Sequence, residues 1–298
     1  MMPTGILLVD KSGGMTSHDV VSRARKALGT RKIGHAGTLD PMATGLLVLG
    51  VDAATRLLTF IVGLDKTYEA TIRLGMSTDT DDAEGEETAR APESAVARIT
   101  ASQTDAGIAM LTGEISQVPS TVSAIKVNGR RAYDLARAGE EVVLKSRNVT
   151  VARFEVVREH RVAGFIDLDV IVDCSSGTYI RALARDLGTY LGVGGHLTAL
   201  RRTRIGPFEV ADATGTDNLG DAALVAPAEV AAEVLGRIDV TEDEARDLRH
   251  GKKLKGAASR LVRTPTAAVD PAGVLVGVIE KRGDDVKSAM NMPKEMPA

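Results

Sequence analysis

Cysteine is nearly absent from the 298-residue sequence: Cys174 is the only one, so the chain cannot form an internal disulfide. No run of apolar residues reaches the length of a membrane span. The N-terminus also lacks a basic segment followed by a long apolar stretch and a cleavage site, which would mark a secretory signal. These absences predict a protein that works in the cytoplasm and does not enter a membrane.

Signatures of metal and nucleotide binding are missing as well. The 5 histidines are scattered along the chain, there is no Cys-x-x-Cys pair, and no P-loop occurs. A uracil methyltransferase would need a nucleotide-cofactor site and usually a reactive cysteine. Cys174 falls instead on an apolar strand face, where an inert packed thiol is expected. We therefore expect no metal ion.

An excess of basic charge is absent too. The formal net charge is −3 and the pI is about 6.0, while 44% of the residues are hydrophobic and 26% are charged. This balance is ordinary for a soluble protein with a substantial core, and it argues mildly against a general polyanion binder. Local patches of charge still decide binding. The acidic run at 79–87 is expected to be a solvated loop.

Hydrophobic periodicity predicts several strands between helices. Alternating or continuous apolar residues indicate strands at 6–9, 46–49, 68–74 and 166–174. The mixture of strands with intervening helices indicates an α+β or α/β fold. The pattern does not determine the order of the strands.

Capping signals predict two helices, one near the start of the chain and one in its second half. One is expected at 17–28 with Ser17 as its N-cap, and one at about 178–187 with Thr178 as its N-cap. Arg181 falls in the first turn of the second helix, where a cation opposes the helix dipole. Its position indicates either a specific anionic partner or a packed stem with the charged head in water. The local sequence leaves both open.

The composition changes after Phe208. Residues 211–220 are small and polar and are expected to form a linker. The following segments are expected to be partly helical, then a strand with a helix, then a hairpin, and finally a mobile tail. These segments are 222–235, 238–254, 267–279 and 284–298.

The most informative segment runs from Gly34 to Gly45, with the sequence GHAGTLDPMATG. Its glycines permit backbone angles that other residues avoid, and Pro41 keeps Asp40 out of the ordinary helical region. Asp40 is therefore expected in a turn at the mouth of a sheet. Taken alone, an aspartate followed by proline is better explained as the N-cap and first residue of a helix.

The complete segment closely resembles the signature of the tRNA pseudouridine synthases of the TruB family, which isomerise a uridine in the T-arm loop, U55. Further pieces of that family's pattern follow in the same order between Gly5 and Phe208. They lie at 5–17, 65–68, 117–119, 123–129, 133–139, 176–181 and 200–203. Several ordered motifs together are far more specific than any one of them.

The resemblance implies an α+β fold with a largely antiparallel mixed sheet flanked by helices. It also implies a catalytic domain at 1–220, with an insertion at about 117–148 that clamps RNA. Residues 221–298 would form a small C-terminal PUA-like RNA-binding module with a flexible tail. Ser12 and Ser120 stand where the family usually has proline, which affects loop detail and not the implied chemistry.

Three residues carry the chemistry that the resemblance implies. Asp40 would act as the nucleophile or as an electrostatic catalyst, and Arg181 would pair with it and keep it ionised. Tyr68 would stack on the uracil and reach a proton, although the sequence alone favours a tyrosine on the inner face of a strand. The reaction adds no group to its substrate, so no cofactor is implied.

The implied partner is the T-arm stem-loop of tRNA, with no membrane and no obligate protein partner. His35 would fill the gap left by the flipped base. Lys11, Tyr179 and Leu200 would line the pocket or contact the substrate. Phosphate contacts are expected from two basic clusters. The clusters contain Lys126, Arg130, Arg131 and Arg137, and then Arg201 and Arg202.

Each of these RNA contacts has a structural alternative. The histidine would otherwise be an ordinary turn residue, the pocket residues would be core, and the basic clusters would be solvated faces with ion pairs. A non-catalytic tRNA-binding protein or tRNA-folding chaperone is the alternative for the whole chain. It would need the same basic clusters but would not need Asp40.

Overall fold

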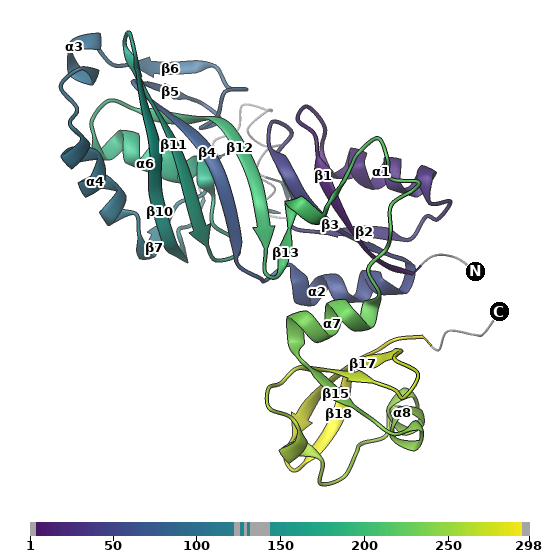
Figure 1. Ribbon diagram of the computed structural model, residues 1–298. Coiled ribbons are helices and arrows are strands. Elements are labelled where there is room, and N and C mark those ends of the chain that lie inside the picture. The colour runs from purple at the N-terminus through teal and green to yellow at the C-terminus, as the bar shows by residue number, and fades with distance from the viewer. Residues whose placement is uncertain (1–3, 122–125, 128–129, 132–143, 294–298) are drawn as a thin grey trace. The chain divides into compact units, whose positions relative to one another are not determined.

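A computed structural model describes residues 4–121, 126–127, 130–131 and 144–293. The chain divides into two compact units (Figure 1). The first unit contains residues 1–64 and 204–298, and the second contains residues 65–203.

The sheet of the first unit is built around two apolar strands. β1 (Gly5–Lys11) pairs antiparallel with β3 (Thr44–Val51), which also pairs antiparallel with β2 (Ile33–Ala36). Alternate residues of β1 and β3 enter two different hydrophobic clusters, so both faces of these strands are covered. Strands covered on both faces have continuous apolar sequences, which confirms the strands predicted at 6–9 and 46–49.

Two helices supply the cover. α1 (Ser17–Ala27) places Val20, Val21 and Ala24 in one cluster, and α7 (Pro227–Leu235) contributes to the other. The N-cap of α1 is Thr16, which forms a capping box with Asp19. The prediction that Ser17 caps this helix is therefore wrong by one residue.

The segment predicted as a linker is partly a strand. β14 (Thr214–Gly215) pairs parallel with β1 through Val9 and Asp10. The backbone of this small and polar segment thus completes the edge of the sheet beside β1. The linker prediction is wrong at these two residues, because composition does not reveal a pairing with a strand 200 residues away in sequence.

The C-terminal part of the first unit has its own sheet and core. The sheet has the strand order β15 (Arg237–Asp239), β16 (Thr266–Val269), β17 (Leu275–Arg282) and β18 (Asp285–Asn291). β15 and β16 are parallel, and the other two pairs are antiparallel. α8 (Glu242–Arg249) packs Leu248 into a cluster with Val276 and Val286. We call residues 237–293 the C-terminal module.

The strand, helix and hairpin predicted in the C-terminal module are confirmed. The prediction of a mobile tail from 284 is wrong as far as Asn291, because β18 adds a strand to the sheet and buries Val286. The end of that predicted tail, 294–298, lies outside the described residues. The division of the chain into domains at residue 220 stays a prediction.

The second unit is built around five neighbouring strands. Its strand order is β12 (Gly195–Ile205), β4 (Lys66–Leu74), β11 (Phe165–Cys174), β10 (Arg147–Val162) and β7 (Gly113–Gln117). β4, β11, β10 and β7 are antiparallel in succession. Burial alternates along β4 and β11, which confirms both strands that were predicted from alternating residues.

Two helices of this unit, α4 (Ala101–Met110) and α6 (Ile180–Tyr190), pack against each other and against the sheet (Figure 1). Helix α6 also packs closely against the turn before β12. The contact leaves no room for a side chain at Gly188, because a Cβ there would lie 2.2 Å from the Gly194 carbonyl carbon. The turn and α6 are thus fixed relative to each other.

Short elements complete the described chain. They are α2 (Leu58–Ile61), α3 (Glu93–Val96), β5 (Met76–Thr78), β6 (Glu87–Arg90), β8 (Lys126–Val127), β9 (Arg130–Arg131) and β13 (Phe208–Glu209). The predicted α+β fold with a largely antiparallel mixed sheet and a small C-terminal module is confirmed. Within the described residues, no helix combines the length and the apolar character that crossing a membrane requires.

Candidate active site

Asp40 lies in a short loop between β2 and β3. We call residues 37–43 the Asp40 loop. Its backbone forms no helix, so the interpretation of Asp40 and Pro41 as a helix start is wrong. Gly37 has φ +83° and Gly45 has φ +99°, values that favour glycine, so the two glycines permit the turn on either side of the loop.

Hydrogen bonds anchor the Asp40 loop to the start of α1. The buried Ser17 hydroxyl donates to the Leu39 carbonyl over 3.2 Å and accepts from the Leu39 N–H over 2.9 Å. The Gly14 N–H donates to the Pro41 carbonyl over 2.9 Å. These hydrogen bonds fix the residues on both sides of Asp40. The backbone of Asp40 is therefore held in place, and its side chain is half-buried.

Lys11, at the end of β1, makes a further tie to the same loop. Its ammonium is fully buried and donates to the carbonyls of Ser12, Met15 and Pro41 over 3.0, 2.8 and 3.2 Å. The predicted substrate contact of Lys11 stays a prediction. The contacts themselves show that Lys11 holds the Asp40 loop against β1.

His35 lies on β2, opposite Leu49 of β3. Its imidazole is half-buried and meets His18 of α1 edge to face, with ring centroids 5.7 Å apart and an interplanar angle of 78°. The ring therefore sits on regular secondary structure just before the Asp40 loop. Its predicted role in filling the gap left by a flipped base stays a prediction.

The second unit carries the other predicted site residues on β4, α6 and β12. Tyr68 lies on the buried face of β4, opposite Val172, and is 8% exposed. Leu200 is buried on β12, Arg201 beside it is half-buried, and Arg202 is 1% exposed. A phosphate would reach Arg202 only after neighbouring side chains move. The predicted roles of these residues stay predictions.

Tyr179 is the N-cap residue of α6, but its side chain makes no capping hydrogen bond to the helix backbone. The predicted cap, Thr178, donates its hydroxyl to the Ser175 carbonyl over 2.9 Å instead, so that prediction is wrong. The buried Gln117 amide accepts from the Tyr179 N–H over 2.8 Å and donates to the Tyr179 carbonyl over 3.1 Å. Arg147 lies over the Tyr179 ring at 5.5 Å.

Arg181 is buried in the first turn of α6, with 4% of its side chain exposed. Its Nη1 donates to the Thr80 carbonyl over 2.8 Å and lies 3.3 Å from Oδ2 of Asp82. The interpretation with its charged head in water is therefore wrong. The alternative of a specific anionic partner is confirmed, and Asp82 is one such partner.

The loop that carries Asp82 is itself rigidly bonded. Oδ1 of Asp82 accepts from the Thr80 hydroxyl over 2.6 Å and from the Glu84 N–H over 3.1 Å, which leaves Oδ2 facing Arg181. Asp81 and Asp82 are both buried. The prediction that the whole acidic run is solvated is wrong for these two residues, because each meets an arginine of α6.

One sequence signal would have located this loop. Arg181 and Arg185 are four residues apart, so they lie on the same face of a helix. Two cations on one face of an otherwise apolar helix need anions, and Asp81 with Asp82 supplies two adjacent ones. The pairing was missed because the two pairs of residues are 100 positions apart in sequence.

The larger basic cluster lies mostly outside the described part of the chain. Lys126 falls on β8, and Arg130 and Arg131 fall on β9, which pairs antiparallel with β8. Arg137 lies outside the described residues. Among the described residues, no group of three or more histidine, cysteine, aspartate or glutamate side chains is arranged to hold a metal ion.

Two buried titratable groups lie side by side where β4 pairs with β11. Burial, followed by the neighbouring charge of Arg202, lowers the pKa of Lys66 from 10.5 to about 8. Burial raises the pKa of the Cys174 thiol to about 11. Because the thiolate is the reactive form, this raised pKa disfavours reaction of Cys174 at neutral pH.

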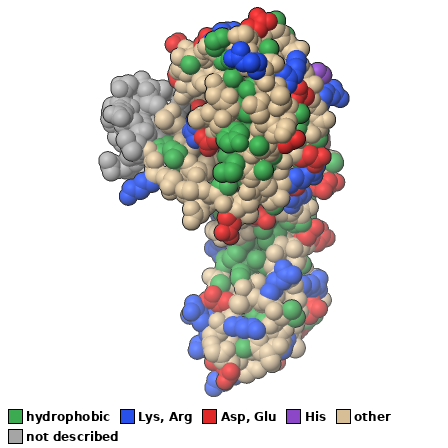
Figure 2. Space-filling view, turned by 90° about the vertical axis from the view of Figure 1, so that its left-hand side faces the viewer, with side chains coloured by type: hydrophobic (Ala, Val, Ile, Leu, Met, Phe, Trp, Pro, Cys, Tyr) green, Lys and Arg blue, Asp and Glu red, His purple; other side chains and the backbone are tan. Residues whose placement is uncertain are grey.

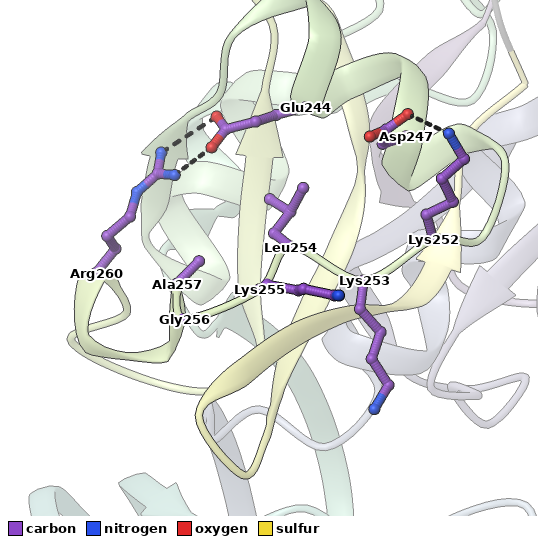
Figure 3. A pocket seen from close by; sticks show the side chains of 9 residues that line it. All are labelled: Glu244, Asp247, Lys252, Lys253, Leu254, Lys255, Gly256, Ala257 and Arg260. Carbon is purple, nitrogen blue, oxygen red and sulfur yellow. Dashed lines mark hydrogen bonds and ion pairs between the residues drawn. The ribbon is translucent and has the colours of Figure 1, made fainter.

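The C-terminal module contains an open pocket between α8 and the segment that follows it (Figure 3). Ion pairs of Glu244 with Arg260 and of Asp247 with Lys252 stand at its two sides. Three lysines line it, and we call Lys252, Lys253 and Lys255 the module lysines. Elsewhere on the surface, positive and negative side chains are interspersed on the face drawn in Figure 2.

Three protein-family models match the chain in succession. The N-terminal domain of the TruB family pseudouridylate synthases matches residues 25–180. The C-terminal domain of tRNA pseudouridylate synthase B matches residues 181–239, and the C-terminal domain of tRNA pseudouridine synthase II matches residues 235–293. The first match contains the Asp40 loop and Tyr68, and the second begins at Arg181.

Curated relatives share more than half of their residues with this chain over most of its length. The tRNA pseudouridine synthase B of Leifsonia xyli is 57% identical over 297 residues, which are 99% of this chain and 98% of that protein. The protein of the same name from Nocardia farcinica is 64% identical over 217 residues, 73% of this chain and 70% of that protein.

A solved structure shares the fold at much lower identity. A chain in the structure of an H/ACA RNP bound to a substrate RNA containing 2′-deoxyuridine superposes with a TM-score of 0.71. It is 22% identical, and the alignment covers 98% of this chain and 86% of that chain.

Proposed function

Because this chain belongs to the TruB family of pseudouridylate synthases, we propose that it converts U55 in the T loop of tRNA to pseudouridine. At the coarser level it is a tRNA pseudouridine synthase, as are relatives more than half identical over nearly its whole length. The observation that carries the finer proposal is the Asp40 loop. It has the signature segment of the family, and its backbone is fixed on both sides of a carboxylate.

The proposed reaction breaks the bond between uracil N1 and ribose C1′ and joins C5 of the same uracil to C1′. The proton on C5 leaves, and N1 gains one, so the product is an isomer of the substrate and no co-reactant is consumed. The Asp40 carboxylate would attack covalently or stabilise the positive charge that develops at the sugar. Both roles need an ionised acid in a fixed position.

We assign Arg181 the task of keeping Asp40 ionised, because a nearby cation lowers the pKa of a carboxyl. The Arg181 guanidinium is buried and bonded to Thr80 and Asp82, so its positive charge is held in one position. A fixed charge loses no orientational entropy during the reaction, which is why preorganised groups are effective catalysts.

Tyr68 and His35 are assigned to the base. The Tyr68 ring would stack on the extruded uracil, and its phenol would reach the C5 proton. His35 would occupy the space that the base leaves in the RNA, since extrusion costs a few kcal/mol before any chemistry. Activity of Tyr68→Phe equal to that of the unchanged protein would exclude the phenol as a proton acceptor, and Tyr68→Leu tests the ring.

We further propose that residues 1–220 form the catalytic domain, with an RNA-clamping insertion at about 117–148. Residues 221–298 would form an RNA-binding module. The module lysines support this role, because all three are exposed and line an open pocket. Lys252 and Lys253 pair with Asp247 and Asp285, and a phosphate would compete with these partly exposed carboxylates. A substrate in the pool of cellular tRNA implies work in the cytoplasm.

Release of tritium from tRNA labelled at uracil C5 tests the function. The unchanged protein is expected to release one tritium for each tRNA, and Asp40→Asn is expected to release none. Asp105→Asn is a matched control, since Asp105 is an exposed aspartate on α4. Replacing U55 with cytidine in the transcript tests the position, and full release from that transcript would contradict the choice of U55.

The same assay separates the enzyme from a non-catalytic tRNA-binding or tRNA-folding protein. Such a protein would bind the transcript and change its folding without releasing tritium. Equal release by the unchanged protein and by Asp40→Asn would also contradict the proposed chemistry.

A further inference from the structure

A second ion pair lies one helical turn beyond Arg181 and has no part in the proposed reaction. Nη1 of Arg185 is 3.2 Å from Oδ2 of Asp81. The other nitrogens of this guanidinium donate to the Val118 carbonyl over 2.7 Å and to Oδ1 of Asp186 over 2.9 Å. The side chain of Arg185 is 28% exposed and that of Asp81 is 12% exposed, so the pair is largely shielded from water.

The geometry of this pair repeats that of its neighbour. Arg181 and Arg185 lie four residues apart on α6 and so project from one face of the helix. Asp81 and Asp82 are adjacent in the chain, and adjacent side chains of an extended segment point to opposite sides. Asp81 avoids this arrangement through a left-handed backbone with φ +61°, which lets both carboxylates meet α6.

A left-handed backbone is unfavourable for a residue other than glycine and persists only where neighbouring contacts hold it. Contacts on both the backbone and the side chain hold it here. The Leu197 N–H donates to the Asp81 carbonyl over 3.0 Å, and the Asp81 N–H donates to the Thr78 carbonyl over 3.4 Å. The Asp81 carboxylate pairs with Arg185 and also interacts with Ser120. Removing Arg185 would leave a buried carboxylate with less compensation, and burial already raises the pKa of Asp81.

We propose that Asp81 and Arg185 form a positioning pair that sets where Arg181 is held. Asp81 stands between Thr80 and Asp82 in the chain, and these two residues supply the acceptors for Arg181. A shift of the backbone at Asp81 therefore moves both acceptors together. This inference rests on the proposed function, because it gives Arg181 a task in the reaction.

Arg185 also connects α6 and the loop of Asp81 to the residues that follow β7. Val118, whose carbonyl accepts from Arg185, directly follows Gln117, whose amide holds the backbone of Tyr179. The first turn of α6 is thus fixed from two directions. Arg185 is bonded both to the acidic loop and to the residues after β7, so its loss would loosen both at once.

The test uses single-turnover pseudouridine formation at saturating tRNA, together with the affinity for tRNA and the midpoint of thermal unfolding. The variants are Asp81→Asn, Arg185→Gln, Arg185→Lys and the double variant with Asn and Gln. Asparagine is chosen because it tolerates a left-handed backbone better than other residues. The controls are Asp105→Asn and Arg153→Gln, which change an exposed aspartate and an exposed ion pair of the same unit.

Asp81→Asn and Arg185→Gln are each expected to lower the single-turnover rate by about 10- to 100-fold, as displacement of a catalytic group does. The affinity for tRNA is expected to stay within about twofold, because neither residue is assigned a contact with RNA. The double variant is expected to be no slower than the slower single variant, since partners in one interaction do not add. Arg185→Lys should recover part of the rate, because it keeps the charge without the planar fork.

Rates within about twofold of the unchanged protein for both Asp81→Asn and Arg185→Gln would overturn the inference. It would also be overturned if affinity fell while the rate at saturation held, which would make Arg185 an RNA contact. A rate loss that only matches the loss of folded protein would show a purely structural pair. Failure of the unchanged protein to act on tRNA would instead contradict the proposed function itself.

Discussion

Replacing Lys66 with methionine would change how the stability of the protein depends on pH. The Lys66 side chain is 5% exposed on β4, and burial lowers its pKa from 10.5 to about 8. The folded protein therefore releases this proton at a lower pH than the unfolded chain does. Between about pH 8 and about pH 10.5 the unfolded chain binds more protons, so the free energy of unfolding of the unchanged protein should rise with pH across this window.

The size of the effect follows from the difference between the two pKa values. Each pKa unit corresponds to about 1.36 kcal/mol, so the full difference is worth about 3 kcal/mol. Residual hydration of the ammonium reduces this to about 2 kcal/mol. Below pH 8 the buried charge destabilises the fold by that amount, whereas a methionine of similar length carries no charge at any pH.

Urea denaturation at about pH 7 and about pH 10 measures the prediction. Methionine also loses the polar contacts of the ammonium, so the absolute stability of Lys66→Met is less informative than its slope with pH. The advantage of the variant over the unchanged protein should shrink by about 2 kcal/mol between the two pH values. Lys145→Met, at an exposed lysine, is the control. A pH-independent difference between Lys66→Met and the unchanged protein would refute the reasoning.

Three further predictions concern packing, the C-terminal module and the thiol. Gly188→Ala should lower the free energy of unfolding by at least about 2 kcal/mol, measured by thermal unfolding, because its Cβ meets the backbone of Gly194. Gly107→Ala, which meets only side chains, should be milder. Changing the module lysines to glutamine should weaken tRNA binding and flatten its salt dependence, with the rate at saturation unchanged. Cys174 should react with a thiol reagent at pH 8 only after unfolding in urea.

The sequence was sufficient where a local pattern has one physical cause. In β4 and β11 the side chains alternate because the backbone is pleated, so the residues facing the core can be identified from their spacing. Gly29 and Gly251, which follow α1 and α8, have positive φ and allow the chain to turn where helix-stop signals predicted. Such features depend on residues close together in the chain.

The sequence was insufficient where pairing joins distant segments. β18 has few apolar residues, and it forms because the edge of β17 is available to it. Asp82 is buried because it pairs with Arg181, which lies about 100 residues later in the chain. The acidic run itself has no local feature that distinguishes it from a solvated loop. The candidate site residues of the second unit were therefore predicted as a set of residues and not as a geometry.

Three of the local rules that failed concern residues next to Asp40 or Arg181. Ser17 has the residue type of an N-cap, but its hydroxyl binds Leu39 of the Asp40 loop. Tyr179 takes the N-cap position of α6 although Thr178 precedes it, and Gln117 satisfies its backbone. Asp81 adopts a left-handed backbone without being glycine. Natural chains tolerate such conflicts mainly where function requires the conformation. Ser17 contacts the Asp40 loop in the first unit, and Tyr179 and Asp81 flank Arg181 and Asp82 in the second. In each unit, therefore, conflicts of this kind fall next to a residue to which we assign a role in the reaction.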